Sequence, residues 1–129
     1  MNNTDKLFKL AQEAASNAYA PYSKFKVGSA IQSTSERFYT GCNVENIAYP
    51  NGSCAETGAI ASMIANGDKQ ISAILIYADS QTLITPCGAC RQRVAEFANK
   101  NTVIYLANSQ GIQKEYTIDE LLPNNFKEF

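Results

Sequence analysis

The amino-acid sequence predicts an α/β sandwich in which helices cover a central β-sheet. After residue 54, apolar segments of strand length alternate with segments that carry apolar residues at helical spacing, which is the pattern of such folds. The chain has 129 residues, and no linker rich in Pro, Gly or Ser divides it. This length fits one domain, so we expect a single domain over residues 1–129.

Each element of this fold is predicted by a local pattern. Apolar residues at helical spacing, followed by Ala20-Pro21, predict an amphipathic helix over residues 4–19. The polar residues 33–36 are typical of a hairpin turn between two strands. Gly67 is well placed to cap a second helix. The other predicted elements are strands 27–33 and 37–43, helix 54–66, strand 71–78, helix 86–99, strand 102–107 and a candidate fifth strand at 115–118.

Charge and hydropathy exclude several classes of function. The formal net charge of −1 gives no sign of the basic face with which nucleic-acid binders displace counterions. The most apolar run, residues 71–78, is too short to span a bilayer, and the first nine residues are polar and unlike a signal peptide. We therefore expect a cytoplasmic protein that acts on a small uncharged ligand, with no nucleic-acid or membrane partner.

The chain contains four cysteines and no histidine. The lack of histidine removes Ser-His and Cys-His catalysis as well as His-rich metal sites. Clustered cysteines in a reducing cytosol are more often metal ligands or catalytic groups than disulfides. Acid–base chemistry near neutral pH must then come from a tuned carboxylate, a thiol, a lysine or metal-bound water.

Three of the cysteines stand where predicted helices begin. Cys54 opens the second predicted helix, while Cys87 and Cys90 lie three residues apart, on one face of the third. Backbone N–H groups at a helix N-terminus stabilise thiolates, the metal-binding form of cysteine. Zinc prefers four ligands, so the fourth must be Cys42, a carboxylate or solvent. An open solvent position is the pattern of a catalytic site, where bound water loses a proton near neutral pH.

Glu56 follows the first of these cysteines by two residues, close enough to contact metal-bound water without binding the metal. Zinc deaminases use a non-ligand glutamate in this way, as general acid and base. Simpler interpretations also exist: Ser53 to Glu56 fits a capping box, and a lone cysteine on a helix is often a small buried hydrophobe. A structural zinc with Cys42 as fourth ligand is another. The ligand count and the placement of Glu56 favour the three-cysteine catalytic site.

Several motifs in the correct order resemble the small homotetrameric cytidine deaminases, which bind zinc through three cysteines. The match covers almost the whole chain, and its motifs are YAPYSKF (19–25), GCNVEN (41–46), CAE (54–56), PCGACRQ (86–92) and ELLP (120–123). The resemblance implies a three-layer sandwich with a central mixed sheet, Zn²⁺ held by Cys54, Cys87 and Cys90, and a homotetramer. It also implies hydrolytic deamination of cytidine or deoxycytidine to uridine or deoxyuridine plus ammonia through a zinc-bound hydroxide, as part of pyrimidine salvage.

The same resemblance implies a set of substrate-binding residues. Asn43 and Glu45 would read the ribose, since an amide and a carboxylate bind hydroxyls in complementary directions. Phe25 would pack on the pyrimidine face. Each has a purely structural alternative: Asn43 could stabilise a turn, Glu45 could be a solvated surface charge, and Phe25 could pack in the core. Val44 belongs to the ribose motif, and backbone groups near Ala55 and Thr85 would contact the base. Tyr49 would belong to the substrate loop, and Phe126 would reach a neighbouring subunit's site.

One position departs from the resemblance. The family commonly has an arginine directly after the catalytic glutamate, whereas this chain has Thr57. Three thiolates outweigh the two positive charges of zinc, which makes bound water less acidic. Thr57 can donate only a neutral, weaker hydrogen bond. We therefore predict that Arg91, directly after Cys90, supplies part of the missing positive charge and is the main partner of the sulfurs outside the metal-ligand set.

This departure keeps other functions under consideration. Blasticidin-type deaminases also lack the arginine, and they act on a cytosine-bearing antibiotic nucleoside. A non-catalytic zinc-binding member of the fold is a second alternative. A thiol redox protein using Cys87 and Cys90 is a third, although it leaves Cys54 and Glu56 without a task. The intact ribose motif and the context of Phe25 favour cytidine.

Overall fold

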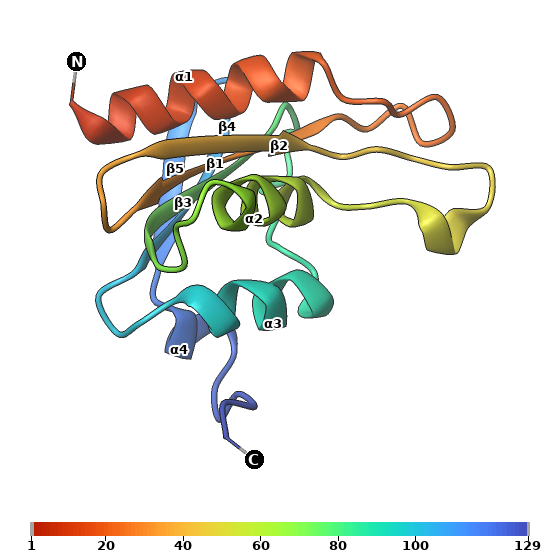
Figure 1. Ribbon diagram of the computed structural model, residues 1–129. Helices are drawn as coiled ribbons and strands as arrows, with labels where there is room; N and C mark the ends of the chain where they lie inside the picture. Colours follow the sequence, from red (N-terminus) through yellow and green to blue (C-terminus); the bar gives the residue numbers. More distant parts are fainter. Residues whose placement is uncertain (1, 129) are drawn as a thin grey trace.

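Residues 2–128 are described by the computed structural model, and a central sheet with helices on both sides confirms the predicted α/β sandwich (Figure 1). The elements are α1 (Asn3–Ser16), β1 (Val27–Ser33), β2 (Phe38–Cys42), the short 3₁₀ helix η1 (Tyr49–Asn51), α2 (Ala55–Ala65), β3 (Ile71–Ala78), α3 (Gly88–Phe97), β4 (Val103–Asn108), β5 (Gly111–Tyr116) and α4 (Ile118–Leu121). Among these residues, no helix combines the length and apolar character needed to cross a bilayer.

Within the described residues, five strands form a mixed sheet in the order β2-β1-β3-β4-β5. β3 and β4 run parallel, while the other neighbouring pairs are antiparallel. The parallel pair requires a crossover, which α3 supplies. Val27 at the start of β1 lies opposite Ala78 at the end of β3, and Gly28 lies opposite Cys42 at the end of β2. The chain segments that lead into α2 and α3 therefore leave the sheet at the same end of the strands.

Helices cover both faces of the sheet, which gives three layers (Figure 1). Alternate residues of β3 point to opposite faces, as the two-residue period of a strand requires. On one face α1 packs against β3 through Leu7, Ala11, Ala15, Ala73, Leu75 and Tyr77. On the other face α2, α3 and α4 pack through Ala59, Ile60, Met63, Ile74, Ile76, Val94, Ile118 and Leu121.

Gly41 lets α2 approach β2 closely. A Cβ atom at residue 41 would overlap the backbone of Ala55 and Ala59 in α2. Because residue 41 has no side chain, the first turn of α2 can pack directly against the end of β2. Gly28 does the same on the opposite face, where a Cβ atom would overlap the backbone of Ala11 in α1.

The starts of α2 and α3 differ from the predicted ones. Cys54 is the N-cap of α2, so the capping box that needed Ser53 at this position is wrong. Cys87 is the N-cap of α3, which places Pro86 before the helix rather than at its first residue. Both N-cap cysteines have extended backbone, with ψ of 160° and 166°, and each therefore lies just outside its helix.

Other boundaries differ because side chains cap helices locally. Thr117 caps α4 through a capping box with Glu120, so Ile118 begins a helix instead of ending the candidate fifth strand. The observed β5 lies earlier, in a hairpin with β4. Gly67 follows the C-cap of α2 with φ of 92°, which confirms its predicted place.

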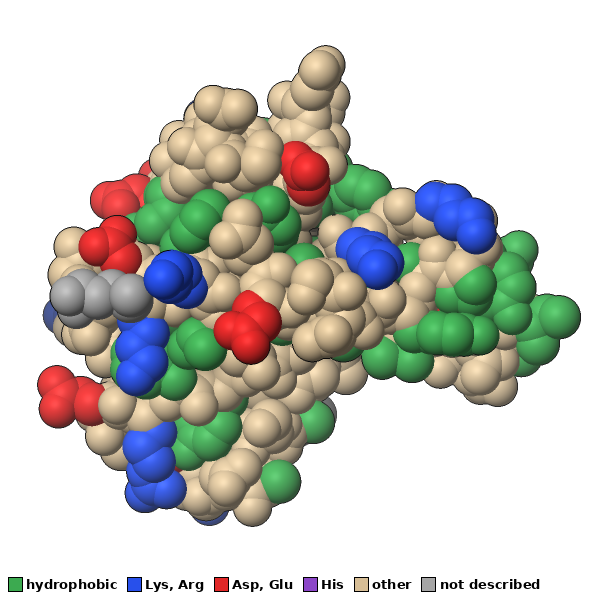
Figure 2. Space-filling view, turned by 90° about the horizontal axis from the view of Figure 1, so that it is seen from above, with side chains coloured by type: hydrophobic (Ala, Val, Ile, Leu, Met, Phe, Trp, Pro, Cys, Tyr) green, Lys and Arg blue, Asp and Glu red, His purple; other side chains and the backbone are tan. Residues whose placement is uncertain are grey.

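Two segments extend beyond the sheet as an arm, on the right of Figure 1. We define the aromatic arm as residues 19–25 and 44–53. Val44 bridges both Tyr19 and Ser53, so the two segments are tied at their base. Hydrophobic side chains gather on this projection in Figure 2. Its most exposed large apolar residues are Ile47 and Tyr49, whose exposed fractions are 80% and 76%.

Candidate metal centre and active site

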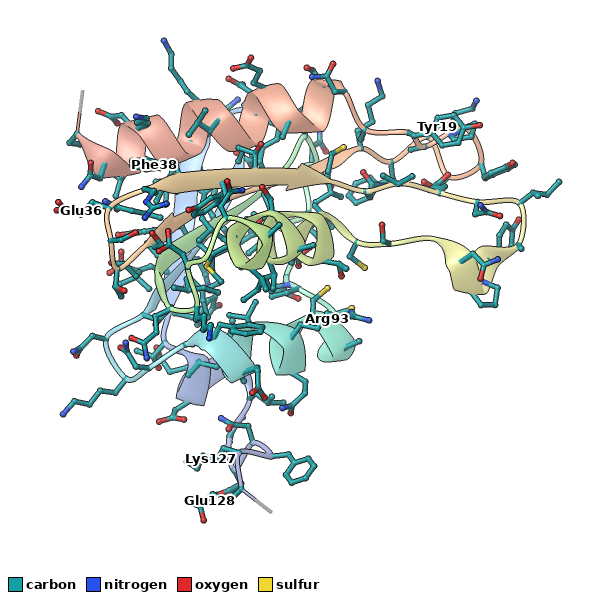
Figure 3. The ribbon with its side chains drawn as sticks, in the orientation of Figure 1. Tyr19, Glu36, Phe38, Arg93, Lys127 and Glu128 are labelled. Carbon is teal, nitrogen blue, oxygen red and sulfur yellow. The ribbon has the colours of Figure 1, made fainter. Side chains whose placement is uncertain are left out.

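Three sulfur atoms meet where α2 and α3 begin, in the space between the two helices (Figure 3). The Sγ atoms of Cys54, Cys87 and Cys90 lie within 4.8 Å of one another. Cys90 lies one turn into α3 and is fully buried. In the described part of the chain, no fourth cysteine, histidine or carboxylate joins the group. Cys42, the alternative fourth ligand, stays half-buried at the end of β2, so the sealed four-cysteine site is not formed.

This donor set fits zinc. Tetrahedral zinc with bonds of about 2.3 Å places its sulfur ligands about 3.8 Å apart, within the spread seen here. Thiolates are soft ligands, which favour zinc over magnesium or calcium. Three protein ligands leave one tetrahedral position for water or substrate, as catalytic zinc sites do.

The cluster is electrostatically costly without a cation. Burial raises the pKa of the Cys54 thiol. Burial also raises the pKa of Cys90, and the neighbouring Glu56 carboxylate raises it further. By contrast, the backbone N–H of Cys90 lowers the pKa of the Cys87 thiol. A divalent cation reverses this situation, because it deprotonates coordinating thiols outright. The arrangement is that of a ligand set rather than of three inert core cysteines.

Glu56 lies in the first turn of α2 and is only 4% exposed. Burial raises the pKa of its carboxyl group. A carboxyl group with a raised pKa can hold a proton and release it again near neutral pH. Buried carboxyl groups with a shifted pKa that line a cavity are typical of catalytic sites.

The sulfurs and Glu56 open into one cavity of about 210 Å³. Asn43, Ala55 and Thr85, all named from the sequence, also line it. Its apolar wall consists of Val27, Ile76 and Ile84, which the sequence analysis missed. The first two lie at the ends of β1 and β3 that face the helix starts, so the predicted strand ends could have indicated them.

A second cavity of about 560 Å³ lies along the aromatic arm. It shares Asn43 and Cys54 with the first cavity, so the two adjoin. Val44, Glu45 and Tyr49, which the resemblance named as substrate-binding residues, line it. Tyr22, which the sequence analysis did not single out, also lines it, and its ring meets that of Tyr49 edge to face with centroids 6.2 Å apart.

Asn43 and Glu45 use their side chains to hold the arm. The amide of Asn43 accepts from the Val27 N–H at 2.8 Å and donates to the carbonyl of Phe25 at 2.8 Å. Glu45 accepts from the Tyr22 N–H at 3.0 Å and from both the N–H and hydroxyl of Ser23. The Ser23 hydroxyl lowers the pKa of Glu45. Both side chains keep unused hydrogen-bonding capacity, which is available to a ligand.

Phe25 and Phe126 stand apart from the residues that line the two cavities. Phe25 is half-buried, and its N–H donates to the Ser23 hydroxyl at 3.0 Å. Phe126 is 63% exposed in the C-terminal segment, where its carbonyl accepts from the Gln92 amide at 2.9 Å. The structure of one chain does not bring either ring to the cysteine cluster.

Neither Arg91 nor Thr57 forms a hydrogen bond to a cysteine sulfur among the described residues. Arg91 donates to the carbonyls of Pro86 and Leu121, each at 2.8 Å, and so ties the start of α3 to the end of α4. Thr57 Oγ1 is buried, and no described residue accepts a hydrogen bond from it. The guanidinium that contacts sulfur is that of Arg93, with Nη1 3.6 Å from Cys90 Sγ. The sequence analysis missed Arg93, although its three-residue spacing from Cys90 is a usable signal.

Comparisons with known proteins agree with this site. Residues 1–106 match the family model described as the cytidine and deoxycytidylate deaminase zinc-binding region. The chain is 40% identical to a cytidine deaminase of Sporosarcina psychrophila over 96% of this chain and 91% of that protein. It is 41% identical to a cytidine deaminase of Halalkalibacterium halodurans, over 93% and 91% of the two chains.

Solved structures give the same result. A crystal structure of cytidine deaminase from Burkholderia pseudomallei superposes with a TM-score of 0.90 at 38% identity, covering 98% of this chain and all of that one. A cytidine deaminase from Mycobacterium tuberculosis gives a TM-score of 0.83 at 30% identity, covering 99% and 98%. With the family model over most of the chain and relatives near 40% identity along nearly all of it, the protein belongs to the zinc-dependent cytidine and deoxycytidylate deaminase family.

Proposed function

We propose that this protein hydrolyses cytidine and deoxycytidine to uridine and deoxyuridine, with release of ammonia. Cys54, Cys87 and Cys90 hold Zn²⁺, and Glu56 moves the protons. The observation that carries this proposal is the shared cavity of about 210 Å³, into which the three cysteines and one buried carboxyl group open together. The names of the curated relatives support cytidine as the substrate.

When bound, zinc acidifies a water molecule and supplies it as the nucleophile. Glu56 accepts a proton from this water as its oxygen bonds to carbon 4 of the cytosine ring, and then delivers the proton to ring nitrogen 3. Glu56 next takes the proton of the new hydroxyl group and passes it to the amino group. The carbon–nitrogen bond breaks, ammonia leaves, and the carbonyl of uridine remains. One carboxyl group serves both steps because its protonation alternates through the cycle.

The adjoining arm cavity accommodates the sugar in this proposal. Asn43 and Glu45 offer their remaining hydrogen-bonding capacity to the ribose hydroxyls, between Val44 and the ring of Tyr49. Backbone groups of Ala55 and Thr85 line the inner cavity, where the base would lie. Phe25 would reach the pyrimidine face by a movement of its half-exposed ring.

We further propose a homotetramer that works in the cytoplasm, in pyrimidine salvage. The exposed apolar side chains of the arm and the open arm cavity support self-association, because neighbouring subunits would cover both. Phe126 would then serve a neighbouring subunit's site. Light scattering on the purified protein tests this, and a monomer at all concentrations would exclude it.

The alternatives have less support. Relatives named cytidine deaminase weigh against a blasticidin-type enzyme. Glu56 beside a three-ligand site weighs against a non-catalytic zinc protein, which needs no buried carboxyl group there. A redox pair of Cys87 and Cys90 leaves Cys54 unexplained within the same cluster.

The test is a cytidine assay in which zinc content, loss of cytidine absorbance and ammonia are measured on one sample. We expect one ammonia per uridine formed. Glu56→Gln, which keeps the shape of the side chain, should retain zinc and lose about 10²- to 10⁴-fold in kcat. A parallel assay with blasticidin S distinguishes the analogue deaminase. A zinc-loaded wild-type protein that leaves cytidine unchanged would refute the proposal.

A further inference from the structure

Arg93 is the cation that faces the cysteine cluster. Its Nη1 atom lies 3.6 Å from the sulfur of Cys90, the most deeply buried of the three cysteines. Figure 3 labels Arg93 on α3, in the space between α3 and α2 where the sulfur atoms gather.

The charges of the site leave a clear need for such a group. Three thiolates and one carboxylate carry four negative charges, and a bound zinc ion carries two positive ones. Arg91 does not fill this need, because its guanidinium donates to two backbone carbonyls. Arg93 forms no ion pair with a carboxylate in the described part of the chain, where the recorded salt bridge joins Arg37 and Asp68.

The local packing leaves the Arg93 side chain in an open position. Arg93 and Thr57 line the same surface hollow of about 430 Å³, which shares no lining residue with the substrate cavity. The buried Thr57 hydroxyl has no hydrogen-bond partner among the described residues. The α2 side of this hollow therefore offers the sulfurs no charged donor, and α3 supplies one.

We propose that Arg93 is a positioning residue whose guanidinium hydrogen bond holds the Cys90 sulfur in place as a metal ligand. This inference rests on the proposed zinc site and deepens it. A guanidinium hydrogen bond to a ligating sulfur withdraws electron density from it, and such partners outside the ligand shell adjust metal affinity. Arg93 lines neither of the two cavities assigned to the substrate, so its effect is transmitted through the sulfur of Cys90.

The test measures metal binding on the zinc-loaded protein, apart from turnover. Zinc transfer to the chromophoric chelator 4-(2-pyridylazo)resorcinol gives the affinity of each variant. Arg93→Ala should bind zinc about 10- to 100-fold more weakly. Arg93→Gln, which keeps length and a donor but loses the charge, should lie between Ala and wild type. Arg93→Lys and millimolar guanidinium chloride added to Arg93→Ala should restore affinity, whereas sodium chloride at equal ionic strength should not.

A spectroscopic measurement separates this role from simple packing. In the cobalt-substituted protein, the thiolate-to-cobalt charge-transfer band of Arg93→Ala should move to longer wavelength, because Cys90 becomes a stronger electron donor. Arg91→Ala is the matched control on the same helix: it should lower the thermal midpoint and leave the band in place.

Two results would overturn the inference. One is an Arg93→Ala protein with wild-type zinc affinity and an unshifted cobalt band. The other is weakened zinc binding that neither lysine nor guanidinium restores, with the band unshifted, which would assign Arg93 to packing alone. Neither depends on cytidine turnover, so failure of the proposed function is recognised separately by the wild-type assay.

Discussion

The cysteine cluster and the aromatic arm lie at the same end of the sheet, but they are built in opposite ways. Cys90 and Glu56 are almost completely buried, and packed helix starts hold the cluster. Ile47 and Tyr49 in the arm are mostly exposed, and the arm is held by backbone bridges and the side chains of Asn43 and Glu45. The chain thus buries Cys90 and Glu56 in packed helices but leaves the arm cavity, which we assign to the sugar, exposed to solvent. Changes in the two regions should therefore have different kinetic signatures.

The largest effect should come from removing a buried ligand. Cys90→Ser should abolish zinc retention and activity, because it replaces the innermost thiolate with a poor zinc ligand. Metal analysis after gel filtration checks this. Cys42→Ser is the matched control, since Cys42 lies outside the cluster, and it should retain stoichiometric zinc. If Cys42→Ser lost zinc while Cys90→Ser kept it, Cys42 rather than Cys90 would be the zinc ligand.

A backbone contact that positions the cluster should have the next largest effect. Gly41→Ala should cost about 1–3 kcal/mol in the free energy of unfolding, because its Cβ would push the first turn of α2 away from β2. Activity should fall as well, since Cys54 and Glu56 begin this helix. Gly88→Ala is the control: a Cβ there meets nothing within 4 Å, and its denaturation midpoint should stay close to wild type.

In the arm we expect a change in KM more than in kcat. Glu45→Gln removes the carboxylate charge. This carboxylate accepts hydrogen bonds from the Tyr22 and Ser23 N–H groups, and we propose that it also binds a ribose hydroxyl. Loss of a charged hydrogen-bond acceptor weakens each of these bonds, so kcat/KM should fall by about 10- to 100-fold. Steady-state kinetics with cytidine measure this. A fall confined to kcat would place Glu45 in the chemical step and remove the distinction between the two regions.

The smallest effect should come from the far end of α2, outside both regions. The Tyr39 hydroxyl lowers the pKa of Asp68, with further bonds from Ser35 and Ser33. A lowered folded pKa means that Asp68 stabilises the protein fully above its ordinary pKa, and that this contribution is lost as pH falls through the lowered value. Asp68→Asn should therefore lower the thermal midpoint at pH 7 and converge with wild type in acid, without loss of zinc. An equal difference at both pH values would contradict this.

Much of the fold could be predicted because its signals are local. Helical and strand periodicities placed the main elements, and Gly67 marked the end of α2 correctly. The boundaries that failed depend on single side chains, such as Thr117, whose capping of α4 ends the strand pattern early. Phe25 was named from a motif that shows which residue is present but not which way its ring lies in one chain.

The available chemistry can be read from the amino-acid order alone: three cysteines at helix starts, a glutamate two residues after one of them, and no histidine to compete. Which of these groups lie together follows from the packing of distant segments in the folded chain. Cys42 stays in β2, and Arg93 rather than Arg91 is the partner of Cys90. Residues 91 and 93 are separated by about 200° around a helix, so only one of them can face the cluster. The three-residue spacing favours Arg93 as the neighbour of Cys90. That Cys90 meets Cys54 there depends on how α3 packs against α2, a contact between distant segments that no local pattern encodes.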